Sequence, residues 1–442
     1  MTGAGAASAL VDRGLDPAEH AAKQSLFDIV LRHFGEVTGA APRHCWWVPG
    51  RLEVFGKHTD YAGGRTLVCA VPRGFAIAAS PRADRRIQVL DALRGQRMVI
   101  PANGDQSAAA TDPASSLQRV AGWCHYVEAV CARLHRNFPG ARFGADLVIA
   151  SDLPSASGMS SSSALVVGVA AALVRTAAIE RRTEWLANIR GDLDRSAYFA
   201  CMENGSGFGT LQGDAGVGTH GGSEDHAAIV TGRPGRLAAF AFVPMRHISD
   251  VKVPDEWRFV LTRSGVAADK TGGALGPYNR LARGAGLLLD IWNGFGPPAA
   301  SLAEALRTSS SAVDRLLEGI RRSTVEGWPS GALERRLAHF IREDARVPAA
   351  AEAFRDADSA ALDSLARGSQ LDAEALLENQ VPETVMLVQS ARALGAFAAS
   401  SFGAGFGGSV WALVDQSAAP ELARRWHPDA FIAVPGPGLT EL

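Results

Sequence analysis

A serine-rich loop that leads into a charge-free helix is the feature that most constrains this chain. The loop, LPSASGMSSSSAL, covers residues 153–165, and no charged side chain follows it until Arg175. Small residues at the start of a buried helix leave backbone N–H groups facing a ligand, and the helix dipole favours negative charge there. Serine hydroxyls can also bond a phosphate or ligate Mg²⁺. The loop indicates a phosphate site, although a serine-rich cap on a core helix explains the same residues equally well.

Composition narrows the class of protein. The chain has 442 residues, of which 47% are hydrophobic and 20% charged, which predicts an ordinary globular protein with two or three domains. A net charge of −2 gives no general attraction to nucleic acid or to an anionic membrane, so a bound anion needs a local site. The five cysteines form no C-x-x-C pair and predict reduced thiols in the cytoplasm. We expect neither a signal peptide nor a membrane span.

The order of apolar and glycine-rich segments predicts an α+β chain rather than regular βαβ alternation. Residues 1–14 are small and low in complexity, which indicates a tail, and a helix follows from Asp16. Strands are expected between Trp46 and about Ile100, and helices over most of 280–400. The other expected helices are 117–138 and 195–203, and the other expected strands are 145–150, 227–230, 237–243, 258–262 and 409–414.

Three stretches carry a family resemblance. They are VPGRLEVFGKHTDYAGG (48–64), the serine loop (153–165) and FGAGFGGSVWALV (402–414). In this order and at these separations they resemble the three motifs of the GHMP kinases, and specifically of the galactokinase branch.

The resemblance implies a two-domain GHMP kinase fold with the active site in the cleft between the domains. The N-terminal domain would be like ribosomal protein S5 domain 2, and the C-terminal domain ferredoxin-like. We expect an N-terminal tail and helix over 1–38, the ATP-binding domain over 39–240 and the C-terminal domain over 241–442.

The resemblance also implies an activity. GHMP kinases of this branch transfer the γ-phosphoryl group of ATP to the anomeric hydroxyl of a sugar, with Mg²⁺ as cofactor. Two alternatives are a catalytically silent relative that senses ATP and sugar, and a kinase for a non-sugar alcohol. The intact serine loop and catalytic Asp favour the enzyme, and the H-x-D-Y of the first motif favours a sugar. We expect sugar and ATP as partners, no nucleic acid or membrane, and a monomer or homodimer.

The resemblance assigns the catalytic and ATP-binding groups. Asp225, in GGSEDH, matches the Asp that accepts the hydroxyl proton or positions it, and Arg51 matches its partner. Ser162 matches the Mg²⁺-ligand serine, and Glu203 the acid that completes the metal site. Asp225 could instead cap a turn, and Glu203 could face solvent. The expected ATP-binding residues are Gly158, Ser160, Ser161, Ser162 and Ser163, with Trp123 either near the adenine or in the core.

The sugar-binding residues include the main departures from the family pattern. The expected set is Glu53, Lys57, His58, Asp60, Gly222 and Tyr278. Lys57 stands where galactokinases have Glu, which reverses a charge near the sugar's C6 end, and Glu53 stands where they have Asn. A lysine there would suit a uronic acid. Alternatively, Lys57 pairs with Glu53 or Glu224 and the specificity is ordinary.

Overall fold

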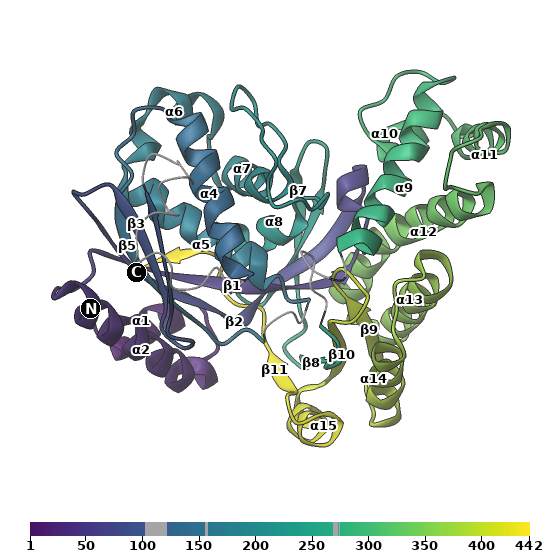
Figure 1. Ribbon diagram of the computed structural model, residues 1–442. Coiled ribbons are helices and arrows are strands. Elements are labelled where there is room, and N and C mark those ends of the chain that lie inside the picture. The colour runs from purple at the N-terminus through teal and green to yellow at the C-terminus, as the bar shows by residue number, and fades with distance from the viewer. Residues whose placement is uncertain (102–121, 155–157, 268–272, 274) are drawn as a thin grey trace.

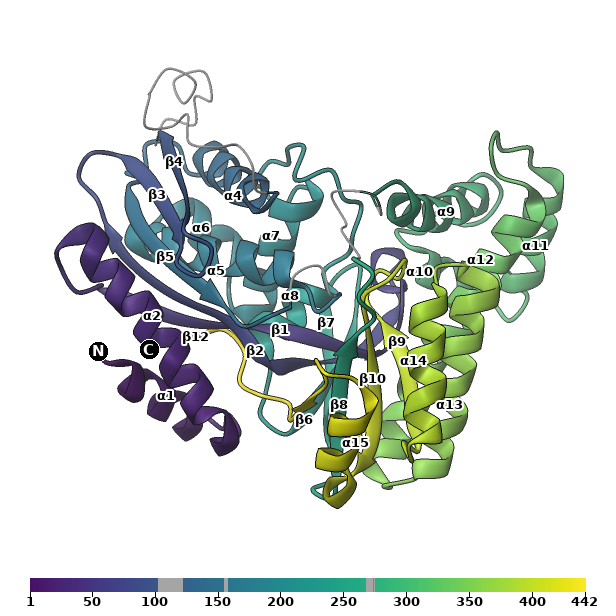
Figure 2. The ribbon, with the colours of Figure 1, turned by 60° about the horizontal axis from the view of Figure 1, so that its bottom comes forward.

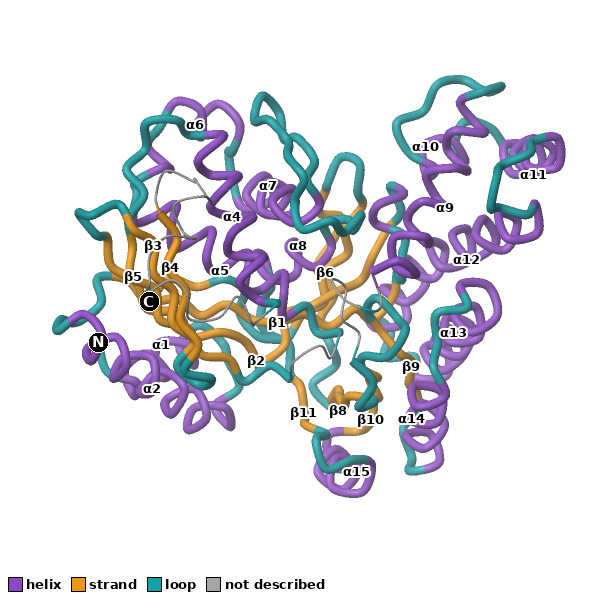
Figure 3. The backbone as a smooth tube through the Cα atoms, in the orientation of Figure 1, coloured by secondary structure: helices purple, strands orange, loops and turns teal. Residues whose placement is uncertain are grey.

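Two lobes, each built on its own β-sheet, make up the molecule (Figures 1 and 3). This is a computed structural model that describes residues 1–101, 122–154, 158–267, 273 and 275–442. Within these ranges one sheet has eight strands and the other has four, so the expected α+β architecture with two domains is confirmed. No helix in the described ranges is long and apolar enough to cross a membrane. All five cysteines are free thiols.

The first sheet has the order β12-β1-β2-β5-β3-β4, with β6 on β2 and β7 on β6. Strand β2 is long enough to pair with β5 through its second half and with β6 through its first residues. Only β3 and β5 pair in parallel among the described strands. The strands are β1 (His44–Phe55), β2 (Arg65–Pro81), β3 (Arg86–Asp91), β4 (Gln96–Pro101), β5 (Ala145–Ser151), β6 (Arg236–Ala241), β7 (Arg246–Lys252) and β12 (Thr440–Glu441).

Helices cover both faces of this sheet (Figure 1). Alternate residues of a strand point to opposite faces, and Trp47 packs with α1 and α2 while Trp46 packs on the other side. The helices are α1 (Gly3–Asp12), α2 (His20–Thr38), α4 (Trp123–Asn137), α5 (Ser161–Thr176), α6 (Thr183–Asn188), α7 (Asp192–Asn204) and α8 (Glu224–Thr231).

Two expectations for this lobe are wrong. Residues 3–12 form helix α1, whose small side chains pack closely on α2, and not a tail. Residues 227–230 belong to helix α8 and not to a strand, because a short apolar run fits a buried helix and a buried strand equally well.

The second lobe places helices against a four-stranded antiparallel sheet of order β11-β8-β10-β9 (Figure 2). Its strands are β8 (Trp257–Arg263), β9 (Ala398–Phe402), β10 (Ser409–Asp415) and β11 (Phe431–Ala433). Its helices are α9 (Leu275–Asn293), α10 (Leu302–Leu306), α11 (Ala312–Arg322), α12 (Ser330–Arg355), α13 (Ser359–Asp372), α14 (Pro382–Ala393) and α15 (Ala419–Trp426).

The chain crosses between the lobes at places that differ from the expected division at residue 240. Strand β7, over 246–252, belongs to the first sheet, because it forms a hairpin with β6. The last strand, β12, returns to the first sheet and pairs with β1 at Trp46 and Trp47. The first lobe therefore takes residues from both ends of the chain, and N and C lie near each other in Figure 1.

Candidate active site

Strand β1 lies against the serine loop because of a glycine and a bulge. A Cβ on Gly50 would meet the carbonyl oxygen of Met159 at 2.7 Å, so only glycine fits there. The Arg51 N–H donates to that same carbonyl at 3.2 Å, and the β1–β2 register shifts between Pro49 and Arg51. A bulge of this kind re-aims a side chain. It directs Arg51 to the cleft between the lobes.

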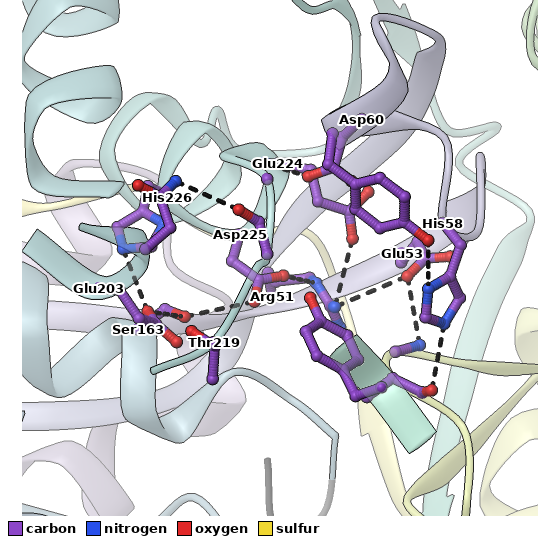
Figure 4. A pocket seen from close by; sticks show the side chains of 17 residues that line it. Arg51, Glu53, His58, Asp60, Ser163, Glu203, Thr219, Glu224, Asp225 and His226 are labelled. Carbon is purple, nitrogen blue, oxygen red and sulfur yellow. Dashed lines mark hydrogen bonds and ion pairs between the residues drawn. The ribbon is translucent and has the colours of Figure 1, made fainter. Parts of the chain in front are cut away.

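The guanidinium of Arg51 is the centre of the site (Figure 4). Its Nε donates to Asp225 Oδ1 at 2.6 Å, and its Nη2 lies 3.3 Å from Glu224 Oε1 and 3.6 Å from Glu53 Oε2. Its Nη1 donates to the carbonyl of Gly158 at 2.8 Å. Arg51 thus joins β1 to α8 and to the serine loop, and it is the only guanidinium that lines this cleft in the described part of the chain.

Ser163 connects the start of α5 to two acids. Its Oγ donates to Glu203 Oε2 at 2.8 Å and lies 3.2 Å from Asp225 Oδ2, and His226 Nε2 lies 3.3 Å from the same Glu203 oxygen. The sequence alignment assigned the metal-ligand position to Ser162. Here Ser162 is half-buried and does not line the cleft, whereas Ser163 does, so the contact falls one residue later than expected.

The Ser163–Glu203 pair fits a divalent cation. Both groups are buried and offer oxygen ligands, and Ser163 lies at the start of α5, where phosphates would bind. Among the described residues no group of three or more His, Cys, Asp or Glu side chains is arranged to hold a metal. Mg²⁺ does not need such a cage, because it takes one or two protein oxygens together with phosphates and water.

Asp60, His58 and Tyr278 form the other end of the cleft. A Cβ on Gly222 would lie 2.0 Å from Asp60 Oδ2, so this position needs glycine, and that oxygen also accepts the Glu224 N–H at 3.2 Å. His58 contacts the Tyr61 hydroxyl at 3.0 Å and the Ala404 carbonyl at 3.1 Å. The ring of Tyr278, from α9, lies 5.7 Å from that of His58.

These groups line one cleft, to which both lobes contribute side chains. It brings together nine of the predicted residues: Arg51, Glu53, His58, Asp60, Ser163, Glu203, Gly222, Asp225 and Tyr278. Lining residues that the sequence analysis did not select as site residues are Tyr61, Asn204, Thr219, Gly221, Glu224, His226, Gly403 and Ala404. Tyr61 and Gly403 lie inside the first and third motifs, so the motif pattern could have identified them. Asn204 and Thr219 lie outside the motifs, and no sequence pattern marks them.

The prediction that Lys57 faces the sugar is wrong in this structure. Its side chain is buried and does not line the cleft, and its Nζ donates to Ser369 Oγ at 3.0 Å and Ser400 Oγ at 2.6 Å. No ion pair among the described residues joins Lys57 to Glu53 or Glu224, so the alternative of a direct pair is not supported either. Gly56 at φ +105° turns the chain so that Lys57 enters the second lobe.

Glu53 and Glu224 are two acids held close together at the sugar end. Burial raises the pKa of Glu53, and the Arg51 charge and a hydrogen bond with Glu224 oppose that rise. Burial, followed by repulsion from Glu53, raises the pKa of Glu224 well above its ordinary value. The Gly403 N–H donates to Glu53 Oε2 at 3.2 Å, so the third motif also meets this pair.

The rest of the serine loop surrounds the start of α5. Ser160 adopts a left-handed conformation at φ +57°, and its buried Oγ meets no hydrogen-bond partner among the described residues. Ser161 and Ser162 lie half-exposed in the first helical turn. Trp123 begins α4, where its Nε1 donates to Gln96 Oε1 at 2.8 Å and its ring packs on the core. Its expected place near the adenine stays a prediction.

Family signatures match this chain at three places. The galactokinase galactose-binding signature matches residues 32–81, the GHMP kinases N terminal domain matches 125–201 and the GHMP kinases C terminal domain matches 350–433. The chain is a GHMP kinase of the galactokinase-like branch. It is therefore an ATP-dependent sugar kinase, and such enzymes work with a divalent metal.

Named relatives span almost the whole of this GHMP kinase. The galactokinase of Actinobacillus pleuropneumoniae is 25% identical over 400 residues, which are 90% of this chain and 91% of that one. The galactokinase of Chloroflexus aurantiacus is 28% identical over 409 residues, which are 90% and 89% of the two chains. A structure of Lactococcus lactis galactokinase complexed with galactose shares the fold, with a TM-score of 0.73 and 21% identity over 93% of this chain and 98% of that one. A mevalonate kinase structure aligns with a TM-score of 0.55 and 14% identity over 88% of this chain and 98% of that one.

Proposed function

We propose that this kinase phosphorylates a monosaccharide at its anomeric hydroxyl, with Mg²⁺-bound ATP as the phosphoryl donor and Asp225 and Arg51 as the catalytic pair. The observation that carries the proposal is the 2.6 Å contact between Arg51 Nε and Asp225 Oδ1, next to the start of the serine-loop helix. The fixed cation attracts the carboxylate and orients it between the phosphate end and the sugar end of the cleft.

The reaction forms one bond and breaks one. The anomeric oxygen bonds to the γ-phosphorus, and the bond from that phosphorus to the β–γ bridging oxygen breaks, which releases ADP. Asp225 accepts the proton of the hydroxyl as the bond forms. Arg51 offsets the charge that develops on the transferred group, and the free N–H groups at the start of α5 hold the phosphates.

The metal would be held by Ser163 and Glu203. When bound, Mg²⁺ would supply positive charge that offsets the charge of the phosphates. Ser163 also bonds Asp225, which ties the metal end of the cleft to the catalytic carboxylate. The predicted ATP contacts of Gly158, Ser160, Ser161 and Ser162 remain part of the proposal.

The arrangement of charges in the cleft does not favour a uronic acid as the substrate. That idea depended on a lysine facing the sugar, but Lys57 bonds two serines in the second lobe. The groups that do line the sugar end include three acids, Glu53, Asp60 and Glu224, and these would repel a carboxylate. We propose a substrate without an anionic group, and a reaction that takes place in the cytoplasm.

An ADP-release assay over a panel of aldoses, hexosamines, uronic acids and inositols tests this proposal. We expect turnover with at least one aldose or hexosamine, a product that carries its phosphate on the anomeric carbon by NMR, and no turnover with inositols. A protein that binds ATP and sugar with no ADP release would instead be a sensor. Phosphate on any other hydroxyl would refute the assignment of the anomeric position.

A further inference from the structure

Two acids in the cleft have no role in the reaction described above. Glu53 is 1% exposed and Glu224 is 7% exposed, and both line the sugar end. One oxygen of each, Glu53 Oε1 and Glu224 Oε2, meets no hydrogen-bond donor among the described residues. A buried, unpaired carboxylate oxygen is costly unless a donor reaches it, so a group on the substrate is the natural partner.

The charges around Glu224 call for a cation. Arg51 and Glu53 face Glu224 from β1, and Asp60 faces it from the turn before β2. Asp225 is the next residue of α8. Arg51 is shared among Asp225, Glu224 and Glu53, and its shortest contact is with Asp225. One guanidinium is therefore shared among several acids, and Glu53 and Glu224, whose hydrogen bond to each other requires a bound proton, are the pair at which an incoming cation would replace that proton.

The position of Glu224 says which part of a sugar it meets. It is the residue before Asp225, which accepts the proton of the anomeric hydroxyl in the proposed reaction. Its own N–H bonds Asp60 Oδ2 at 3.2 Å, and Asp60 is the expected acceptor for hydroxyls farther round the ring. Glu224 lines the cleft together with Asp225 and Asp60, so in the proposed binding mode the ring substituent next to C1, at C2, is the group that it would meet.

We infer that the substrate is a hexosamine, with a free ammonium group on C2 that pairs with Glu224 and Glu53. This rests on the proposed sugar 1-kinase activity and specifies its substrate class. The ammonium donates to the unpaired oxygens, and its charge offsets the repulsion between the two acids. The phosphoryl transfer is unchanged, because the anomeric oxygen still attacks the γ-phosphorus and Asp225 still takes the proton.

Steady-state kinetics at pH 6.5 tests the charge. An amine with a pKa near that of an α-amino group, about 7.7–8.0, is protonated there. We expect kcat/KM for galactosamine, glucosamine or mannosamine to exceed that of its parent hexose by at least tenfold, about 1.4 kcal/mol. N-acetylgalactosamine, which has no charge, and galacturonate should both fall below galactose. At pH 9 the amine is neutral, and the preference should shrink.

Glu224→Gln identifies the residue that reads the amine. It keeps the shape and removes the charge, so the ratio of kcat/KM between hexosamine and hexose should fall at least tenfold. The control is Glu326→Gln, an exposed acid that does not line the cleft, which should leave the ratio unchanged. If Glu224→Gln lowers both values by the same factor, Glu224 acts only through Arg51 and the inference is overturned.

The outcomes separate the inference from the proposed function. A kinase that turns over neutral hexoses and treats hexosamines no better refutes the hexosamine assignment and leaves the kinase assignment intact. If no sugar gives ADP, the proposed function fails, and calorimetric binding of galactosamine against galactose decides the inference by itself. Equal affinity for the two sugars would overturn it, and a preference for galactosamine of tenfold or more would support it.

Discussion

Replacing Lys57 with Met should cost stability and leave sugar preference unchanged. The wild-type Nζ makes two hydrogen bonds, to Ser369 and Ser400, and hydrogen bonds to a charged group contribute about 1.5–3 kcal/mol each. Removing the ammonium also ends the cost of burying it, and Met fills a similar volume. Glu343, the acid with the largest electrostatic effect on Lys57, keeps its ion pair with Arg346 at 2.8 Å. We therefore expect a loss of about 1–3 kcal/mol in the free energy of unfolding.

Lys57→Glu should cost more than Met does. It removes the cation and adds a buried carboxylate near Glu343 and Glu53, and an uncompensated buried charge typically costs about 3–5 kcal/mol. Lys252→Met is the control, because that lysine is exposed and pairs only with Asp255 at the surface. Its effect should stay below about 0.5 kcal/mol.

Urea unfolding and steady-state kinetics together test whether Lys57 stabilises the fold or contacts the sugar. Burial lowers the pKa of Lys57 below its ordinary 10.5, so the unfolded state binds more protons between the two values. Wild-type stability should then rise with pH across that window, and Lys57→Met should lack the rise. Sugar ranking should be the same in wild type and Lys57→Met. An altered ranking with unchanged stability would show that Lys57 reads the substrate and would refute this reasoning.

Three further predictions concern the cleft itself. Asp225→Asn should lower kcat by about 10²-fold or more with little change in ATP affinity by calorimetry, as for the loss of a positioned base, and a wild-type rate would contradict the assignment. Ser163→Ala and Glu203→Ala should raise the Mg²⁺ concentration for half-maximal activity more than Ser162→Ala does; a larger effect of Ser162→Ala would restore the position that the alignment gave. Because the pKa of Glu224 is raised in the folded state, the stability that its bound proton contributes is fully present at low pH and is lost as pH rises through the folded-state pKa. Glu224→Gln should therefore make the free energy of unfolding in urea less dependent on pH. Relative to wild type, the variant should be more stable at pH 8 than at pH 5.

The sequence predicted the site well where contacts lie inside a motif. Arg51, His58 and Asp60 come from one stretch of ten residues, and the strand and turn that carry them fix their relative positions. Asp225 followed from the motif pattern even though the secondary structure around it was misassigned. A motif can therefore identify a catalytic carboxylate even where the secondary structure of the segment that carries it is predicted wrongly.

The sequence could not predict contacts that depend on distant residues or on a single step of register. Lys57 bonds Ser369 and Ser400, which lie more than 300 positions away, and no local pattern marks those serines as its partners. Ser162 and Ser163 are neighbours in a run of four serines, so one step of helical rotation decides which of them meets Glu203.

These contacts also explain why the departures from the galactokinase pattern should act as a set. The cation at position 57 is held in the second lobe by two serines, so exchanging Lys57 alone disturbs that lobe without restoring an acid at the sugar's C6 end. Glu53 and Glu224, in contrast, change the charge beside Arg51 inside the cleft, which Lys57 does not line. A change of specificity toward galactose should therefore need Glu53 and Glu224 to be replaced first, with Lys57 following only once Ser369 and Ser400 are also changed.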